Sequence, residues 1–446
     1  MKKSALLMVL FSITMWNSYA QDKSNQHNFT IQQCIDYAKK NNVQVKNALL
    51  DIKIQNEVNR GITSAALPQL TASGSSMNYI DIPTTLIPAK IFGGPDGVFT
   101  PVKFGTKYTT SASLQLQQII FDGQVFVGLQ ARDASMIFRQ KALEVTEENI
   151  KVNIYKIYYQ LVVSKSQIEL LDANIDRIEK LLKDVKEIYK NGFAEQLDID
   201  KLTVQLSNIK TEKEKVLNAV EMGYLGLKTL IGMPVKESIV LKDILSYDDI
   251  KAGLLTDTAS LYNNRKEYQY LESVKKLNEY NIKRYRLAHL PTIAAVGSYS
   301  KNAQRNKFTY FEKGDWFTSS FIGLNVSLSL FDGFYKDSKI KQSNFELQQT
   351  QNTIDYFKLS VDNDVAQSTL KFNSAISTLE SQKRNMALAE TVYNQTKKKF
   401  EAGTGSNTEI NTAQTDLKSA QTNYISAMYD AIIAKIDYLK AIGKLP

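Results

Sequence analysis

One long helical pattern occurs twice in this chain, and this duplication limits the possible folds more than any other feature. Apolar or small residues recur in alternating steps of three and four, the spacing of a coiled-coil seam. One seam covers 150–189 and returns, 211 positions later, over 361–400. A second seam over 199–230 returns at the same offset over 410–441. A constant offset shared by both seams indicates an internal duplication.

Each pair of seams predicts two long antiparallel helices joined by a short tip. Two proline-free stretches, 102–233 and 292–445, contain them, as expected because an interior proline breaks a helix. Between the seams lie "YKNGFAEQLDID" and "FEAGTGSNTEIN", where Gly192, Gly403 and Gly405 are helix-stopping residues. The first arm would be roughly 100 Å long, far beyond the span of a globular core. Such arms must pack laterally against other helices.

Four segments with alternating polarity lie upstream of the helical arms. We expect strands at about 68–80, 108–121, 291–301 and 318–331. Pro68 and Pro291 mark the change from helix to strand at the start of the first and third segments. Apolar residues alternating with small polar ones over about ten residues fit a membrane β-strand. A half-buried sheet in a soluble protein has the same period, so the period alone leaves both possibilities open.

The change from strand period to helix period follows the same tripeptide, Phe-Asp-Gly, in both halves. We expect each phenylalanine to end a strand, each aspartate to cap the next helix, and each glycine to let the backbone turn. These predicted hinges are Phe121, Asp122 and Gly123 in the first half, and Phe331, Asp332 and Gly333 in the second.

The chain begins with the layout of a secretory signal peptide. Residues 1–20 contain two lysines, a short apolar run and a small-residue cleavage site. The mature chain then divides into a first repeat, 21–233, with its helical hairpin at about 122–231, and a second, 234–446, with its hairpin at about 332–442. The single cysteine, Cys34, permits no internal disulfide, and we expect it to be a small buried residue.

Charge and motifs argue against nucleic-acid binding and catalysis. The net charge of +9 is spread over helical segments and forms no basic stripe of the kind that nucleic acid requires. The two histidines, His27 and His289, lie near the start of the chain and at a predicted helix end. No catalytic constellation, metal-spaced cluster or cofactor motif is evident, and "GTGSNT" lacks the lysine of a phosphate-binding loop. We therefore expect no enzyme, no cofactor and no metal.

The mature sequence has no apolar run long enough for a membrane-spanning helix, so a membrane role would have to involve the strands. Four strands cannot close a barrel, and an open sheet edge in lipid leaves backbone groups without hydrogen bonds. If these strands lie in a membrane, several chains must share one barrel.

The ordered set of these features resembles the TolC-type outer-membrane efflux proteins over nearly the whole mature length. The resemblance rests on the two "LP" strand openings, the two "FDG" junctions, and the tips "NGFAEQLDIDKL" and "AGTGSNTEINTA". The resemblance implies a mixed α+β membrane protein: a homotrimer with a shared twelve-stranded β-barrel, continued by a periplasmic α-helical barrel. It also implies the outer membrane of a Gram-negative-type cell, a periplasmic adaptor protein, and an inner-membrane pump of the RND or ABC type. Its role would be the exit duct of an efflux or type I secretion system.

The resemblance assigns functions to the tips. Acidic residues would line the narrowest part of the tunnel, which places Asp198 and Glu409 at a selectivity gate. An acid in a first helical turn is also stabilised by the helix dipole without any pore, so both interpretations stay open. The residues expected to contact the adaptor are Gly192, Phe193, Gly403 and Thr404. Well-known members carry a basic latch residue where this chain has Gly405, so a latch here must use other groups.

The main alternative is a periplasmic coiled-coil scaffold or adhesin without a channel. The helical hairpins fit that alternative, whereas the alternating strands and duplicated junctions do not. The sequence identifies neither the transported substrate nor the class of pump.

Overall fold

The computed structural model describes residues 26–243, 250, 261–310, 312 and 314–446. The predicted signal peptide, residues 1–20, lies outside this described part. The chain forms two compact units, and each takes segments from both sequence repeats. The helical unit comprises Met1–Leu49, Ala142–Gln269 and Tyr356–Pro446. The strand unit comprises Leu50–Lys141 and Tyr270–Asp355.

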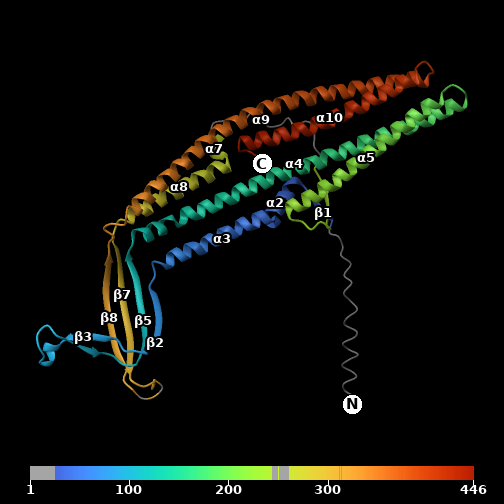
Figure 1. Cartoon of the computed structure of the whole chain (residues 1–446). Helices are drawn as coiled ribbons and strands as arrows, with labels where there is room; N and C mark the ends of the chain where they lie inside the picture. The colour runs from blue at the N-terminus through green and yellow to red at the C-terminus, as the bar shows by residue number, and fades with distance from the viewer. Residues whose placement is uncertain (1–25, 244–249, 251–260, 311, 313) are drawn as a thin grey trace, which may run out of the picture. The chain divides into compact units, whose positions relative to one another are not determined.

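Two long helical hairpins dominate the chain (Figure 1). The first consists of α4 (Gly123–Lys190) and α5 (Gln196–Ile231). The second consists of α9 (Tyr335–Glu401) and α10 (Asn407–Ala441). The α4 and α9 helices have 68 and 67 residues, and α5 and α10 have 36 and 35. The duplicated seams therefore fold into nearly equal hairpins.

The seam residues form the core of the helical unit. Ile178, Leu202 and Leu417 are fully buried there, each from a different helix, and Tyr393 of α9 packs into the same cluster. In the second hairpin, the rings of Phe372 and Tyr438 stack with centroids 5.8 Å apart. Burial of these side chains supplies the main driving force for packing, because burying one large apolar side chain contributes about 1.5–3 kcal/mol.

The helical unit also contains small elements that the seams do not predict. They are β1 (Gln26–Phe29), α2 (Ile31–Asn41), β6 (Ser238–Leu241) and α7 (Leu261–Asn264). The β1 and β6 strands pair in parallel, although they come from different repeats. Thr30 and Gln33 form a capping box at the start of α2. Cys34 on this helix is fully buried, which confirms the expectation from sequence.

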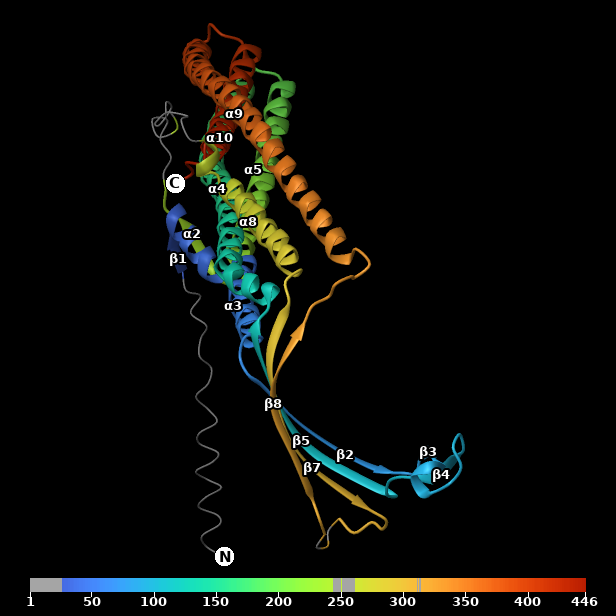
Figure 2. The ribbon, with the colours of Figure 1, turned by 90° about the vertical axis from the view of Figure 1, so that its left-hand side faces the viewer.

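The strand unit contains a four-stranded antiparallel sheet in the order β2-β5-β7-β8 (Figure 2). Its strands are β2 (Gln69–Asn78), β5 (Tyr108–Phe121), β7 (Thr292–Arg305) and β8 (Phe317–Ser327). The prediction for the end of the last strand is wrong. β8 ends at Ser327, so Phe331 lies in a non-strand connection, and Leu328 and Leu330 have no partners in the ladder.

Two helices and one hairpin of the strand unit were absent from the sequence-based expectation. The helices α3 (Val43–Ser64) and α8 (Lys266–Leu287) precede β2 and β7. Between β2 and β5, the strands β3 (Thr84–Pro88) and β4 (Phe99–Lys103) form a separate hairpin, with the short helix η1 (Ala89–Phe92) between them. Large apolar side chains of this β3–β4 hairpin, among them Ile91 and Phe92, are exposed.

Candidate functional site

The described ranges contain no group of three or more His, Cys, Asp or Glu residues that could hold a metal ion. Within those same ranges, no helix is long and apolar enough to cross a membrane. The candidate functional features are the tips of the hairpins and the strand-to-helix junctions, which the sequence singles out, together with the surfaces of the strand unit.

The first tip is built by a left-handed glycine followed by an acidic cap. Gly192 has φ +82°, a conformation that favours glycine and ends α4. The next residue, Phe193, is 85% exposed. Asp198 accepts a hydrogen bond from the backbone N–H of Glu195 at 3.3 Å, at the start of α5.

The second tip repeats this arrangement with different residues. Gly403 has φ +74° and ends α9, and the N–H of Thr404 donates to the carbonyl of Lys399 at 3.0 Å. Glu409 accepts from the N–H of Ser406 at 3.4 Å, and the hydroxyl of Ser406 accepts from the N–H of Glu409 at 3.1 Å. This reciprocal pair is a capping box.

Both predicted gate acids thus take part in helix capping. Asp198 is half-buried and Glu409 is exposed. Capping uses one carboxylate oxygen of each residue and leaves the other available to solvent or to a passing ion. The selectivity role of these acids, and the adaptor-contacting role of the four tip residues, stay predictions. At Gly405, an added Cβ would lie 3.0 Å from the backbone N of Phe400, so the turn itself leaves little room for a side chain.

A buried polar layer in the helical unit was missed from sequence. The amide of Asn174 on α4 donates to Gln421 at 2.8 Å and accepts from Gln414 at 2.9 Å, both on α10. Arg177 also donates to Asn174 at 2.9 Å and lies over the ring of Tyr393 on α9, at 5.9 Å from its centroid. Gln414 and Gln421 are one heptad apart, and this spacing was the available signal.

At the first strand-to-helix junction, the expected cap is present. Asp122 accepts hydrogen bonds from the N–H groups of Gln124 and Val125 at 2.7 and 3.1 Å. Its other oxygen accepts from the hydroxyl of Thr292, the first residue of β7, at 3.1 Å. Gly123 needs no left-handed conformation. Its special feature is packing, because an added Cβ would lie 2.3 Å from the carbonyl oxygen of Leu287.

The second junction has a different geometry from the first. Asp332 accepts from the N–H of Lys336 at 3.2 Å, near the start of α9. Gly333 has φ +66° with open space around it, and Phe334 also has a positive φ of 65°. The sequence predicted one role for both glycines, but only Gly333 provides the turn. Both prolines lie where expected, since Pro68 and Pro291 directly precede β2 and β7.

The sheet has one mainly apolar face and one mainly polar face. Leu70, Leu116 and Ile322 lie in one row across the strands, with Gly297 between the last two. A row on the opposite face, three positions further along the strands, consists of serines on all four strands: Ser73, Ser113, Ser300 and Ser319. The hydroxyl oxygens of Ser73 and Ser113 are 2.7 Å apart. The apolar side chains are solvent-exposed, with Ile322 at 92%.

Helices of the strand unit follow the same order as its strands. Asn59 of α3 donates to the carbonyl of Arg132 on α4, and Lys283 of α8 donates to Gln130 on α4. Asn281 of α8 donates to Ser343 on α9. The order α3-α4-α8-α9 therefore matches β2-β5-β7-β8, and in both layers the outermost elements have a free side.

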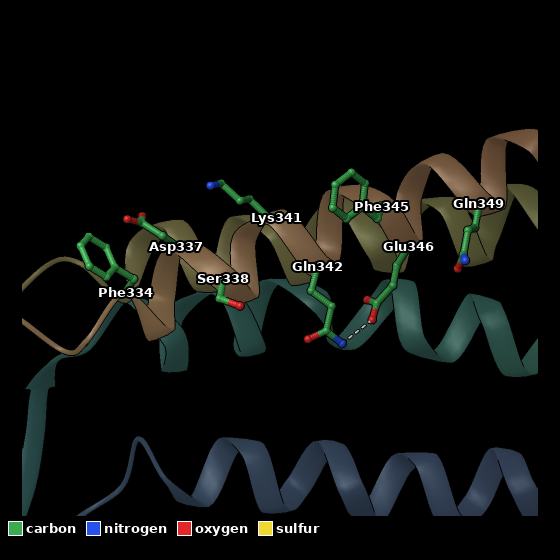
Figure 3. A pocket seen from close by; sticks show the side chains of 8 residues that line it. All are labelled: Phe334, Asp337, Ser338, Lys341, Gln342, Phe345, Glu346 and Gln349. Carbon is green, nitrogen blue, oxygen red and sulfur yellow. Dashed lines mark hydrogen bonds between the residues drawn. The ribbon is translucent and has the colours of Figure 1, made fainter.

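These free sides carry exposed apolar residues. Leu50, Ile54 and Val58 recur every four residues on α3 and are 49–58% exposed. A groove of about 700 Å³ lies along one side of α9, and Phe334 and Phe345 line it with polar side chains between them (Figure 3). Within this groove Gln342 donates to Glu346 at 2.8 Å.

Comparisons with known proteins agree with the resemblance found in the sequence. Residues 262–444 match the family model described as "Outer membrane efflux protein". TolC of Vibrio cholerae is 19% identical over 340 residues, which cover 75% of this chain and 77% of that protein. TolC of Escherichia coli is 21% identical over 461 residues, covering 100% of this chain and 87% of that protein. The chain is thus similar to the TolC-type outer-membrane efflux proteins, as its sequence motifs indicated.

The fold agrees with these sequence matches. The crystal structure of the outer membrane protein VceC from Vibrio cholerae superposes with a TM-score of 0.73 at 12% identity, covering 93% of this chain and 96% of VceC. The resemblance inferred from the tips and junctions is thereby confirmed. The family match and the relatives named TolC support an outer-membrane channel of the efflux type, and they argue against the scaffold alternative.

Proposed function

We propose that three copies of this TolC-type chain form one exit duct, with a shared twelve-stranded β-barrel in the outer membrane and an α-helical barrel in the periplasm. The observation that carries this proposal is the matching order of strands and helices in the strand unit. Both layers are open, and the free elements at each edge are consecutive in the chain: α3 leads into β2, and β8 leads into α9.

A sheet edge in lipid is costly because its N–H and C=O groups find no partner there. Pairing β2 of one copy with β8 of the next satisfies both edges at once. The same contact would bring α3 of one copy to α9 of the next, and cover Ile54 and Val58 on one side and Phe345 on the other. Twelve strands are the result of three such contacts.

The mainly polar face of the sheet would then line the pore. The serine row contains hydroxyl groups only, so it offers hydrogen bonds to water without a fixed charge. The mainly apolar face, with Leu70, Leu116 and Ile322, would contact lipid. This division is that of a membrane barrel, whose strands alternate lipid-facing and lumen-facing residues.

The tips would dock onto a periplasmic adaptor, and through it onto an inner-membrane pump of the RND or ABC type. Phe193 supports this part of the proposal, because an aromatic side chain that is 85% exposed on a hairpin tip is an unfavourable surface unless a partner covers it. A photo-crosslinking residue at position 193 should capture the adaptor in the native envelope. The same residue at Leu225, exposed on the shaft of α5, is the matched control.

Disulfide trapping between copies tests the shared barrel. A cysteine replaces Ser73 on β2 and a second one is scanned over Phe317, Ser319 and Phe321, the β8 residues on the same face, in a background where Cys34 is alanine. Oxidation should give covalent dimers and trimers only when both cysteines are present. A control pair with the second cysteine at Ser300, on the inner strand β7, should stay uncrosslinked. A purified protein that is monomeric with native spectra would overturn the proposal.

A further inference from the structure

A shallow hollow of about 650 Å³ lies on the mainly apolar face of the sheet, close to its end at the β7–β8 loop. Its floor consists of small residues on neighbouring strands: Ala72, Gly74 and Ala112. An added Cβ at Gly74 would meet only one backbone oxygen, at 3.8 Å. The floor therefore leaves room for another molecule's atoms against the sheet.

Two aromatic side chains and one cation surround this floor. Tyr299 on β7 and Trp316, which directly precedes β8, both line the hollow. Lys301 lines it as well, two residues beyond Tyr299 on the same face of β7. Among the described residues, no carboxylate forms an ion pair with Lys301. The hollow thus combines an apolar floor with a single positive charge.

Polarity rises along β7 from Gly297 to Lys301. On this face the order is Gly297, Tyr299, Lys301, Ala303 and Arg305. Arg305 is already engaged, since it donates to the carbonyl of Thr309 and lies over the ring of Tyr310. An apolar surface followed by an aromatic residue and then a lysine is the sequence of environments at a membrane boundary, where an acyl region gives way to headgroups.

We propose that this hollow binds an anionic acyl lipid, with an acyl chain on the small-residue floor and the phosphate of the headgroup on Lys301. The proposal rests on the proposed function, in which this face contacts lipid. Charge complementarity selects the occupant: a zwitterionic lipid would present a compensating cation beside Lys301, whereas an anionic lipid would not. One lysine beside an anionic lipid surface should change relative affinity about five-fold.

Trp316 provides a specific probe. The chain has two tryptophans, and the other, Trp16, precedes the expected cleavage site. Mature protein is reconstituted into phosphatidylcholine vesicles containing phosphatidylglycerol, with bromine on the acyl chains of one lipid or of the other. Brominated phosphatidylglycerol should quench Trp316 more than its bulk fraction predicts, and brominated phosphatidylcholine should quench it less.

Three variants separate headgroup from chain. Lys301→Gln should lower the relative affinity for phosphatidylglycerol about five-fold and leave quenching by phosphatidylcholine in place. Ala112→Leu, which fills the floor, should reduce quenching by both lipids. Lys307→Gln removes the same charge from an exposed position that does not line the hollow, and it should retain the wild-type preference.

Equal quenching by the two lipids, or a preference that survives Lys301→Gln, would overturn the lipid site. Loss of the preference on adding inorganic phosphate at constant ionic strength would also overturn it, in favour of a free-anion site. Absence of quenching by either lipid would show that this face does not contact lipid. If the same preparation still conducts ions in planar bilayers, only the lipid-site proposal is contradicted. If it does not conduct, both the lipid-site and the exit-duct proposals are contradicted.

Discussion

Gly123 packs directly against Leu287: a Cβ on the glycine would lie 2.3 Å from the carbonyl oxygen of Leu287 and 2.7 Å from its Cβ. The equivalent residue of the second repeat, Gly333, has no atom within 4 Å of such a Cβ, but its φ is +66°. The same tripeptide therefore requires glycine for two different physical reasons, one of close approach and one of backbone conformation.

Substitutions can tell these two reasons apart. Gly333→Asn should be nearly neutral because asparagine tolerates the left-handed region, whereas Gly333→Val should cost about 1–2 kcal/mol. At Gly123, Ala, Asn and Val should all destabilise the protein, since each adds a Cβ against a backbone carbonyl. Thermal unfolding and the yield of assembled protein measure both series. Equal tolerance of asparagine at the two positions would contradict this distinction.

The buried polar layer should fix the pairing of α4 with α10. Asn174→Leu leaves the buried amide of Gln414 without its acceptor, whereas Gln421 still accepts from Arg177 at 3.4 Å. The single variant should therefore be destabilised by about 1–3 kcal/mol. Replacing Gln414 with leucine as well removes the unsatisfied amide and should recover much of that loss. Denaturant unfolding of the single and double variants measures it. A double variant less stable than the single variant would mean that the layer contributes net stability.

The tip acids offer a test of ion selectivity. Asp198→Asn together with Glu409→Gln keeps an oxygen acceptor for each cap but removes the charge. If the six acids of a trimer surround a constriction, cation preference should fall, most clearly at low ionic strength, where screening is weak. Reversal potentials in planar bilayers under a salt gradient measure this. Asp416→Asn, on the exposed shaft of α10, is the matched control. An unchanged reversal potential in the double variant would mean that these acids act only as helix caps.

Cys34 should make stability depend on pH in alkaline solution. Burial, and secondarily the negative charge of Asp243, raise the pKa of its thiol from 9.0 to about 12. The unfolded chain therefore loses this proton at lower pH than the folded chain does. The protonated thiol contributes its full stabilisation below pH 9. As pH rises from 9 toward 12, the free energy of unfolding falls by about 1.4 kcal/mol for each pH unit.

The test compares wild type with Cys34→Ala by denaturant unfolding between pH 8 and 11, where the variant should have the flatter profile. Buried tyrosines such as Tyr155, whose pKa burial also raises to about 12, contribute equally to both proteins and cancel in the comparison. Parallel profiles for the two proteins would show that the thiol does not titrate differently in the two states.

Local sequence determined the hairpins, their tips and the start of each strand. The seams recur with helical spacing, Gly192 and Gly403 can adopt the left-handed conformation, and Pro68 and Pro291 cannot continue a helix. Each of these features depends on one residue type or on a short-range period, so it can be predicted without knowing which distant segments it contacts. The α3 and α8 helices escaped prediction because no duplicated seam marks them.

Tertiary structure decided what depends on contacts between distant segments. Ser327 rather than Phe331 ends β8, because the β7 ladder runs out at Thr292, opposite Ser327. Gly123 and Gly333 look alike in sequence, and only the position of Leu287 separates their roles. The pairing of Asn174 with two glutamines, and the meeting of Lys301, Trp316 and the small residues of β2 and β5, likewise exist only after folding. A periodic pattern specifies which face of an element is apolar, but the register between elements is set by packing across the whole unit.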